Sequence, residues 1–164
     1  MPAKSRKVSQ PKSTRPLMPG YGIPKTSKGL LPWTWAEQRL KKSHNYWIST
    51  ARPDGSPHSM VIWGLWLDGA FYFSTGAQSR KAQNLAHNPK CVIGTEKAEQ
   101  AVVVEGEAHL TRDPELLRRF AGLYEKKYKW DMKDSTEPVY VVRPRVAFGL
   151  YEKNFMGSAT KWKL

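Results

Sequence analysis

Alternating apolar and polar residues in the middle of the chain predict a run of short strands joined by tight turns. Residues 45–51, 58–67 and 70–75 have strand-like composition, and an Asp-Gly pair lies in each turn, at residues 54–55 and 68–69. Asp-Gly pairs suit the positive φ angles of hairpin turns. The three strands are therefore expected to form an antiparallel meander.

The second of these strands is apolar on both faces. Met60, Ile62 and Trp66 alternate with Val61, Trp63, Leu65 and Leu67. A strand with one solvated face would show a polar residue at every second position. One face is therefore expected to line a barrel interior, and the other to be covered by a second subunit or a ligand.

Four further segments are expected to be strands, at residues 90–96, 100–111, 139–142 and 146–151. Together with the meander they make six or seven strands, and helices are expected only in the connections. That arrangement is typical of an antiparallel barrel and not of a doubly wound α/β sheet. The pattern thus predicts a mainly β fold, a six- to seven-stranded antiparallel barrel with a few short peripheral helices.

Capping patterns mark where these helices begin. Thr34 and Glu37 fit a capping box for a helix over about residues 35–43. Ser79 is expected to cap a second helix that ends near residue 88. Asp113, followed by a proline, is expected to cap a third. The apolar stripe of that third helix consists of Leu116, Leu117, Phe120, Leu123 and Tyr124.

The chain carries a net charge of +13, and about half of it lies in residues 1–32, which contain seven basic residues and no acid. This stretch is rich in Pro, Ser and Lys and too poor in apolar residues to support a core, so a disordered basic tail is expected. The folded domain is then expected over residues 33–164. A solubilising extension explains the tail more simply than a polyanion-binding arm, so nucleic acid is not expected as a partner.

Cysteine and histidine usage gives no sign of a disulfide or a metal site. Cys91 is the only cysteine, and the four histidines are scattered along the sequence at His44, His58, His87 and His109. No apolar run approaches the roughly 20 residues needed to span a bilayer, and the N-terminus lacks the apolar stretch of a secretory signal. These features predict a cytoplasmic protein with no membrane association.

The strongest chemical signal is a strand–turn–helix junction. The strand ends at Ser74 and Thr75, a Gly-containing turn follows, and a helix begins at Ser79-Arg80-Lys81. Free backbone N–H groups and the positive end of the helix dipole meet a hydroxyl and two cationic side chains there. Cations are unfavourable in the first turn of a helix unless an anion compensates them. The junction therefore predicts a phosphate site.

The order of these features resembles the pyridoxamine 5′-phosphate oxidase-like family of FMN-binding split β-barrels. The likeness covers roughly residues 35–164 and includes Ser79-Arg80-Lys81 and Asn84-Leu85. Gln100 opens a strand where that family often places a cofactor-contacting Gln. Residues 143–149 and 159–162 look like the corresponding segments of its actinobacterial-type relatives. The resemblance implies a split β-barrel.

The resemblance also implies a cofactor site at the interface of a homodimer. The side chains that would hold the cofactor phosphate or its ribityl chain are Ser74, Thr75, Ser79, Arg80 and Lys81. The residues that would run beneath the ring are Met60, Val61, Ile62 and Trp63. Gln100 would reach the ring or the ribityl chain from the facing subunit.

Two departures separate the chain from true pyridoxamine 5′-phosphate oxidases. Ser59 and Gly64 stand where those enzymes carry an Arg and a Lys, and the Lys helps to bind the substrate phosphate. Their C-terminal Arg-Leu-His segment has no clear counterpart in residues 160–163. Vitamin B6 oxidation is therefore not expected.

What the resemblance implies instead is an oxidoreductase that transfers hydride to or from a small uncharged substrate, using FMN or the 8-hydroxy-5-deazaflavin coenzyme. The cofactor supplies the electronic chemistry, so such an enzyme needs no acid–base dyad, and no catalytic residue is assigned. Trp63, Trp66 and Trp162 are candidates either for the aromatic wall of a substrate pocket or for core and dimer contacts. The alternative function is non-catalytic binding of flavin, deazaflavin or haem on the same barrel.

Overall fold

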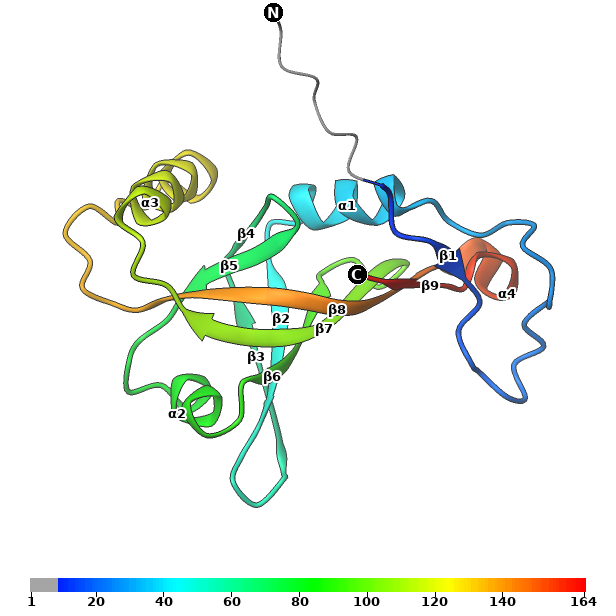
Figure 1. The fold of residues 1–164 in the computed structure, drawn as a ribbon, viewed down its shortest axis with the longest axis horizontal. Coiled ribbons are helices and arrows are strands. Elements are labelled where there is room, and N and C mark those ends of the chain that lie inside the picture. The colour runs from blue at the N-terminus through cyan, green and yellow to red at the C-terminus, as the bar shows by residue number, and fades with distance from the viewer. Residues whose placement is uncertain (1–8) are drawn as a thin grey trace, which may run out of the picture.

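Nine strands form one antiparallel sheet in residues 9–164, the part of the chain that the computed structural model describes (Figure 1). Neighbouring strands along the main path are β1 (Ser13–Thr14), β9 (Thr160–Lys163), β8 (Val139–Tyr151), β7 (Gln100–Leu110), β6 (Lys90–Thr95), β2 (Tyr46–Ala51) and β3 (Pro57–Ile62). Off this path, β5 (Ala70–Ser74) pairs with β8, and β4 (Leu65–Leu67) pairs with β5. The predicted mainly β, antiparallel barrel fold is confirmed, with more strands than the sequence suggested.

The barrel is split between β3 and β4, which the sequence predicted as one continuous strand. A Cβ atom at Gly64, between the two, would lie 2.2 Å from the ring of Phe71. The Gly64 N–H donates to the Tyr128 hydroxyl at 2.9 Å, and its carbonyl accepts from Lys127 Nζ at 3.0 Å. These side chains satisfy backbone groups that a strand ladder would otherwise pair, so the strand ends here.

In β8 the structure differs from the prediction in the opposite sense: two segments predicted as separate strands form one continuous strand. Pro144 interrupts the pattern in the sequence, but a β-bulge accommodates it. Gly106 pairs with Pro144 and the preceding Glu105 pairs with Val146, which leaves Arg145 as the extra residue. A Cβ atom at Gly106 would lie 2.4 Å from the Arg143 carbonyl oxygen, so the close approach of the two strands requires glycine.

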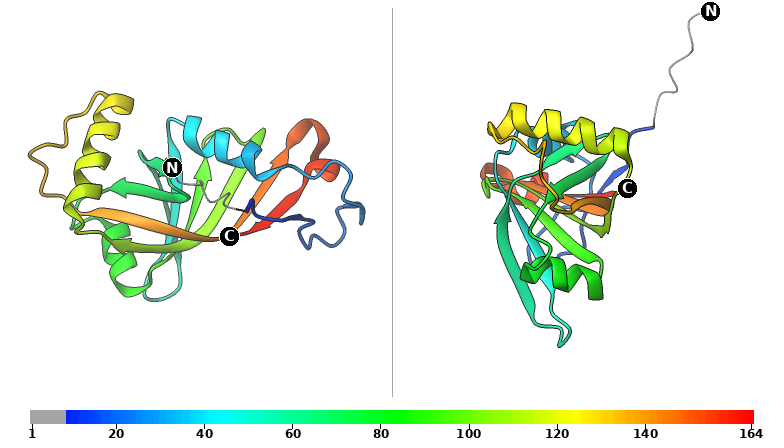
Figure 2. Two further views of the ribbon diagram at one scale, coloured as in Figure 1. Left: turned by 45° about the horizontal axis from the view of Figure 1, so that its top comes forward. Right: turned by 90° about the vertical axis from the view of Figure 1, so that its left-hand side faces the viewer.

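Four helices lie at the connections in the described part of the chain. They are α1 (Trp33–Lys42), α2 (Arg80–His87), α3 (Pro114–Tyr128) and the short α4 (Phe155–Ser158), which follows a 3₁₀ turn, Glu152–Asn154. In Figure 2, α3 lies across one side of the sheet and α2 lies on the other, near the β2–β3 hairpin. None of the helices in residues 9–164 is long and apolar enough to cross a bilayer.

Two of the three predicted helix starts are confirmed, and the first is wrong. Ser79 accepts a hydrogen bond from the Ala82 N–H, and Asp113 caps α3. Helix α1 begins at Trp33, and Thr34 lies inside it without capping it. The Trp33 ring packs edge-on against Trp162 with the centroids 5.5 Å apart. Burial of this ring in the core, rather than a capping box, determines where α1 begins.

Two apolar clusters stabilise the fold. The larger fills the barrel, and its fully buried side chains include Tyr46, Ile48, Phe71, Phe73 and Trp162. The smaller lies beneath α3 and contains Leu65, Tyr72, Phe120, Tyr124, Tyr128, Val139 and Val141. Trp66 and Trp162 belong to the larger cluster, so these two candidates for a substrate-pocket wall are core residues.

Residues 9–32 differ from the expected disordered tail. Strand β1 pairs with β9, and the Arg15 guanidinium donates four hydrogen bonds of 2.6–3.0 Å to backbone carbonyls. These carbonyls belong to Thr26, Lys28, Gly157 and Ala159. Composition missed this segment because long-range hydrogen bonds and a few apolar contacts, such as Leu31 against the core, hold it in place. The predicted tail also includes residues 1–8, which lie outside the described residues.

Candidate functional site

The predicted phosphate site lies where β5 ends and α2 begins. The Ser79 hydroxyl accepts from the Ala82 N–H at 3.3 Å, and Thr75 Oγ1 lies 3.3 Å from the same oxygen. The Ser74 hydroxyl donates to the Pro138 carbonyl at 2.9 Å and so ties the junction to the loop before β8. Thr75 and Ser79 therefore meet at the start of α2, whereas Ser74 has a structural partner.

Backbone donors remain free at this helix start. In residues 9–164, the N–H groups of Arg80 and Lys81 have no acceptor, since the Ser79 side chain and carbonyl accept only from Ala82 and Gln83. Such free N–H groups and the helix dipole attract an anion. The turn before them already holds one anionic group, because the Ala77 N–H donates to the Glu137 carboxylate at 2.9 Å.

Positive charge gathers at the same place without an acidic partner. Arg80 is exposed and Lys81 is half-buried, and neither takes part in the ion pairs found among the described residues. Burial lowers the pKa of Lys81. The pKa of His58 is lowered first by burial and then by three nearby cations, Arg52, Lys81 and Arg80. Cations from the β2–β3 hairpin and from the start of α2 thus both lie close enough to His58 to act on it.

His58 adds an unsatisfied polar atom to this group. Its Nδ1 atom is buried and has no hydrogen-bond partner within residues 9–164. A buried polar atom without a partner is costly, and a bound water, or a ligand that displaces the side chains covering it, would satisfy it. The phosphate of a flavin nucleotide fits this arrangement because it accepts hydrogen bonds from backbone N–H groups, cations and a protonated ring nitrogen alike. Arg52 and His58 were not part of the predicted site; a histidine in the strand beside it was the only signal in the sequence.

The residues expected beneath the cofactor ring divide into two pairs. Met60 and Val61 lie on the edge strand β3 and are 48% and 46% exposed. Ile62 is buried in the core, and Trp63 stacks on Tyr128 with the ring centroids 4.7 Å apart. Only the first pair offers side chains, beside the unpaired backbone of an edge strand, to a ligand or a second chain.

A cavity of about 440 Å³ opens beside the junction. Ser74, Thr75 and Gly76 line one side of it, and Tyr124 and Trp130 contribute aromatic side chains. Trp130 is 59% exposed and lies edge-on to Trp63, with the centroids 6.4 Å apart. Sequence reasoning missed Trp130; the only signal in the sequence was a Trp two positions after the Lys-rich end of α3.

Gln100 is not part of this junction. It begins β7 and pairs with Tyr151 at the end of β8, whereas Ser74 pairs with Val139 at the start of β8. At a rise of roughly 3.3 Å per residue, those ends of β8 are about 40 Å apart along the strand. The Gln100 amide oxygen instead accepts two hydrogen bonds from Arg39, on α1. The structure therefore does not bring Gln100 to the phosphate site of its own chain.

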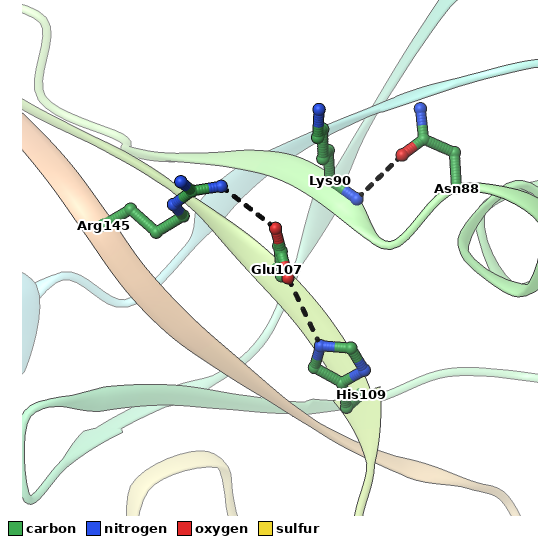
Figure 3. A network of polar contacts seen from close by, with 5 residues as sticks. All are labelled: Asn88, Lys90, Glu107, His109 and Arg145. Atoms are coloured by element: carbon green, nitrogen blue, oxygen red, sulfur yellow. Dashed lines mark hydrogen bonds and ion pairs between the residues drawn. The ribbon is translucent and has the colours of Figure 1, made fainter.

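A second polar cluster, on the outer face of the sheet, differs from the start of α2 because its arginine has an acidic partner (Figure 3). The Glu107 carboxylate accepts from Arg145 Nη1 at 3.1 Å and lies 3.7 Å from His109 Nε2. The Lys90 N–H donates to Asn88 Oδ1 at 3.1 Å. Here the Arg145 charge has an acidic partner, as in many surface ion pairs of small energetic weight. Within residues 9–164, no three His, Cys, Asp or Glu side chains are grouped so as to hold a metal ion.

Comparison with known proteins supplies a family and a set of similar folds. The family model described as pyridoxamine 5′-phosphate oxidase matches residues 35–149. General stress protein 26 from Bacillus anthracis strain Sterne has a TM-score of 0.61 and 22% identity, covering 71% of this chain and 91% of that one. An F420 reductase has a TM-score of 0.57 and 21% identity, covering 68% and 94%.

A heme binding protein from Mycobacterium smegmatis has a TM-score of 0.62 and 20% identity, covering 81% of this chain and 59% of that one. The comparison with curated proteins gave no match. At these identities the structural neighbours show a shared fold, and together with the family model they agree with the split-barrel topology described above.

Proposed function

Because the chain belongs to the pyridoxamine 5′-phosphate oxidase family, we propose that it is a flavin-dependent oxidoreductase that works as a homodimer. It binds FMN at the start of α2 and transfers hydride to or from a small uncharged substrate. One observation carries the proposal: Arg80 and Lys81, in the first turn of α2, have no ion-pair or hydrogen-bonding partner in the described chain, and both lie close enough to His58 to lower its pKa.

The roles of the residues follow from their positions. The free N–H groups of Arg80 and Lys81 and their side chains hold the phosphate, and Thr75 and Ser79 supply hydroxyls beside it. Met60 and Val61, on the open edge of β3, lie against the ring. The bound flavin itself supplies the hydride chemistry, and the protein orients the ring and shields one of its faces.

A second subunit is proposed to complete each site. Trp47 on β2 is 50% exposed and pairs with the exposed Val61 across the strands, so the sheet presents an apolar edge next to the phosphate site. Covering this edge would bury apolar side chains and pair the free backbone groups of β3. Gln100 also needs a second subunit, because about 40 Å of β8 separates it from the start of α2 in its own chain.

FMN is proposed ahead of the 8-hydroxy-5-deazaflavin coenzyme, whose tail is polyanionic. The cavity beside Ser74 and Thr75 is lined by three carboxylates, Asp131, Asp134 and Glu137. A polyanionic tail extending from the phosphate into this cavity would be repelled, whereas FMN ends at the phosphate. The similarity to an F420 reductase keeps the deazaflavin as the second cofactor to test.

Pyridoxamine 5′-phosphate is not the proposed substrate. The structure gives a physical reason at Gly64, where the ring of Phe71 leaves no room for any side chain and therefore none for a phosphate-binding Lys.

Non-catalytic cofactor binding is the second candidate function. The specific observation in its favour is the similarity of the fold to that of a heme binding protein from Mycobacterium smegmatis. The absorbance spectrum of the loaded protein separates haem from flavin. Turnover of reduced flavin with a panel of enones and quinones separates a carrier from an enzyme.

The phosphate assignment is tested by comparing FMN with riboflavin, which has the same ring without the phosphate. In the Arg80→Ala/Lys81→Ala variant, the Kd for FMN is expected to rise at least about 100-fold, because two charge-assisted contacts are lost. The Kd for riboflavin is expected to change little. Lys90→Ala, an exposed cation outside the junction and away from Gln100, is the control. Unchanged FMN affinity in the double variant would refute the site.

A further inference from the structure

Gln100 and Arg39 form an isolated polar pair at the corner between β7 and α1. The Gln100 amide oxygen accepts from Arg39 Nε at 2.9 Å and from Nη2 at 2.5 Å. A guanidinium group donates hydrogen bonds and cannot accept them. The amide oxygen must therefore face Arg39, and the amide NH₂ group must point away. That NH₂ group has no acceptor in residues 9–164.

Arg39 is itself held rigidly. Its Nη1 atom donates to the Trp35 carbonyl at 2.9 Å, and its guanidinium carbon lies 3.7 Å from the centroid of the Trp35 ring. Arg39 takes part in none of the ion pairs between described residues, and burial lowers its pKa. Arginine usually binds a carboxylate in a partly buried site. Here Arg39 binds the neutral amide of Gln100 instead, and this pairing fixes the orientation of the amide.

The free amide donors lie at an open surface. Arg39 and Gln100 line a cavity of about 260 Å³, together with Lys42 and Lys97. Since the start of α2 is at the other end of β8, a ligand that meets these donors must be held by another molecule. A second copy of this chain, with its own Arg80 and Lys81, supplies such a ligand.

We propose that Arg39 is a positioning residue that turns the Gln100 amide so that its NH₂ group donates a hydrogen bond to the flavin ring held by the facing subunit. The inference rests on the proposed flavin function and adds to it an orientation and a residue from α1. Hydrogen-bond donors aimed at the ring stabilise the reduced flavin, whose acceptor atoms carry more negative charge. Loss of this donor therefore weakens binding of reduced FMN more than binding of oxidised FMN.

Three variants separate orientation from simple packing. Gln100→Glu keeps the contact with Arg39 as an ion pair but replaces the NH₂ donor by an acceptor. Arg39→Met keeps the apolar stem over Trp35 and releases the amide. Arg39→Lys keeps one donor for the amide oxygen. Its ratio of Kd values for oxidised and reduced FMN should therefore lie between those of the wild type and Arg39→Met. Lys90→Met, which removes an exposed cation on β6 outside this cavity, is the control.

The measurement is the ratio of the Kd values for oxidised and reduced FMN in the full-length dimer. In Gln100→Glu and Arg39→Met, this ratio is expected to shift about tenfold against the reduced form, equal to a fall in two-electron potential of about 30 mV. Lys90→Met should keep the wild-type ratio. An unchanged ratio in Gln100→Glu and Arg39→Met, in a wild-type dimer that binds FMN, refutes the inference alone. A wild-type chain that binds no FMN refutes the proposed function as well.

Mixed dimers test whether Gln100 acts on the facing subunit. A dimer of one Arg80→Ala/Lys81→Ala chain and one Gln100→Glu chain has one site with an intact phosphate cradle facing an intact Gln100. The wild-type Kd ratio is therefore expected at one site per dimer. If Gln100 acted on the cofactor of its own chain, no intact site would form, and the shifted ratio would contradict the inference.

Discussion

Lys81 and Lys127 are both half-buried lysines with lowered pKa values, and their surroundings differ completely. Burial lowers the pKa of Lys127 to about 8, and its ammonium group donates to the Tyr46 hydroxyl at 2.9 Å and to the Gly64 carbonyl at 3.0 Å. It also lies over the rings of Tyr46 and Tyr128. Lys81 has no hydrogen-bond or ion-pair partner in the described part of the chain.

The difference separates a charge that serves the fold from one that is available to a ligand. Lys127 satisfies the backbone where the barrel opens, so its desolvation is offset by internal contacts. The desolvation of Lys81 has no such compensation, which is expected where a ligand completes the site. Three changes at these two regions test the distinction.

The largest effect is expected at Gly64, the residue that Lys127 contacts. Gly64→Ala places a Cβ atom 2.2 Å from the Phe71 ring, and overpacking of this kind should lower the free energy of unfolding by about 3 kcal/mol. Gly76→Ala, in the turn before α2, is the matched control because no atom lies within 4 Å of its Cβ. It should change stability by less than about 0.5 kcal/mol in chemical denaturation. Equal losses in the two variants would mean that the Gly64 region is no more constrained than the turn.

A smaller effect is expected from pH. Lys127 has a pKa of about 8 in the folded chain and about 10.4 when unfolded. Between these values the unfolded chain binds more protons, so stability should rise from pH 8 to pH 10, by about 1 kcal/mol because the amine is partly exposed. The pKa values of Tyr46 and Tyr128 are raised, so these groups lower stability only above about pH 10. Burial also raises the pKa of the Cys91 thiol to about 12. This thiol lowers stability above about pH 8.5 and opposes the rise, so the rise is measured in a Cys91→Ala chain.

Urea midpoints across this pH range should show the rise in the Cys91→Ala chain and lose most of it when Lys127→Met is added. The remainder comes from Lys81, whose pKa is lowered in the same direction. A rise that persists in full in Lys127→Met would assign it to other groups.

The smallest effect is expected from inorganic phosphate as a probe of the start of α2. At a phosphate concentration near its Kd, ligand binding should raise the free energy of unfolding by about 0.4 kcal/mol. Lys127→Met should keep this increment and Lys81→Met should lose it, measured against sodium chloride of equal ionic strength. If Lys127→Met lost the increment and Lys81→Met kept it, Lys127 and not Lys81 would be the lysine available to the ligand.

Local signals in the sequence predicted the parts of the fold that are determined locally. The caps of α2 and α3 were found because Ser79 and Asp113 bind N–H groups two or three positions away. The break at Gly64 was missed because it depends on Phe71 and on side chains of α3, more than 60 positions away. Thr34 was misassigned because burial of Trp33 outweighed its capping preference.

The residues of the candidate site also divide into those that local sequence signals could predict and those that depend on long-range contacts. The junction of Thr75, Ser79, Arg80 and Lys81 could be predicted because it is one continuous segment. Arg52 and His58 reach it from a different hairpin, and the partner of Gln100 is Arg39, 61 positions earlier. No spacing rule relates such positions, because the sheet register brings them together. Ile62, at the end of β3, and Trp63, directly after it, follow Met60 and Val61 in the chain but pack into the interior, which the doubly apolar pattern did not resolve.

The hydrogen bonds of Arg15 and Ser13 change where a shortened version of the protein can begin. Ser13 Oγ is the acceptor for the indole N–H of the fully buried Trp162, and its own hydroxyl donates to the Leu31 carbonyl. A fragment starting at residue 33, where composition places the domain boundary, would leave that indole N–H in the core without an acceptor and expose the β9 edge. The practical boundary for expression lies before Ser13, so this hydrophilic leading segment is an integral part of the folding unit.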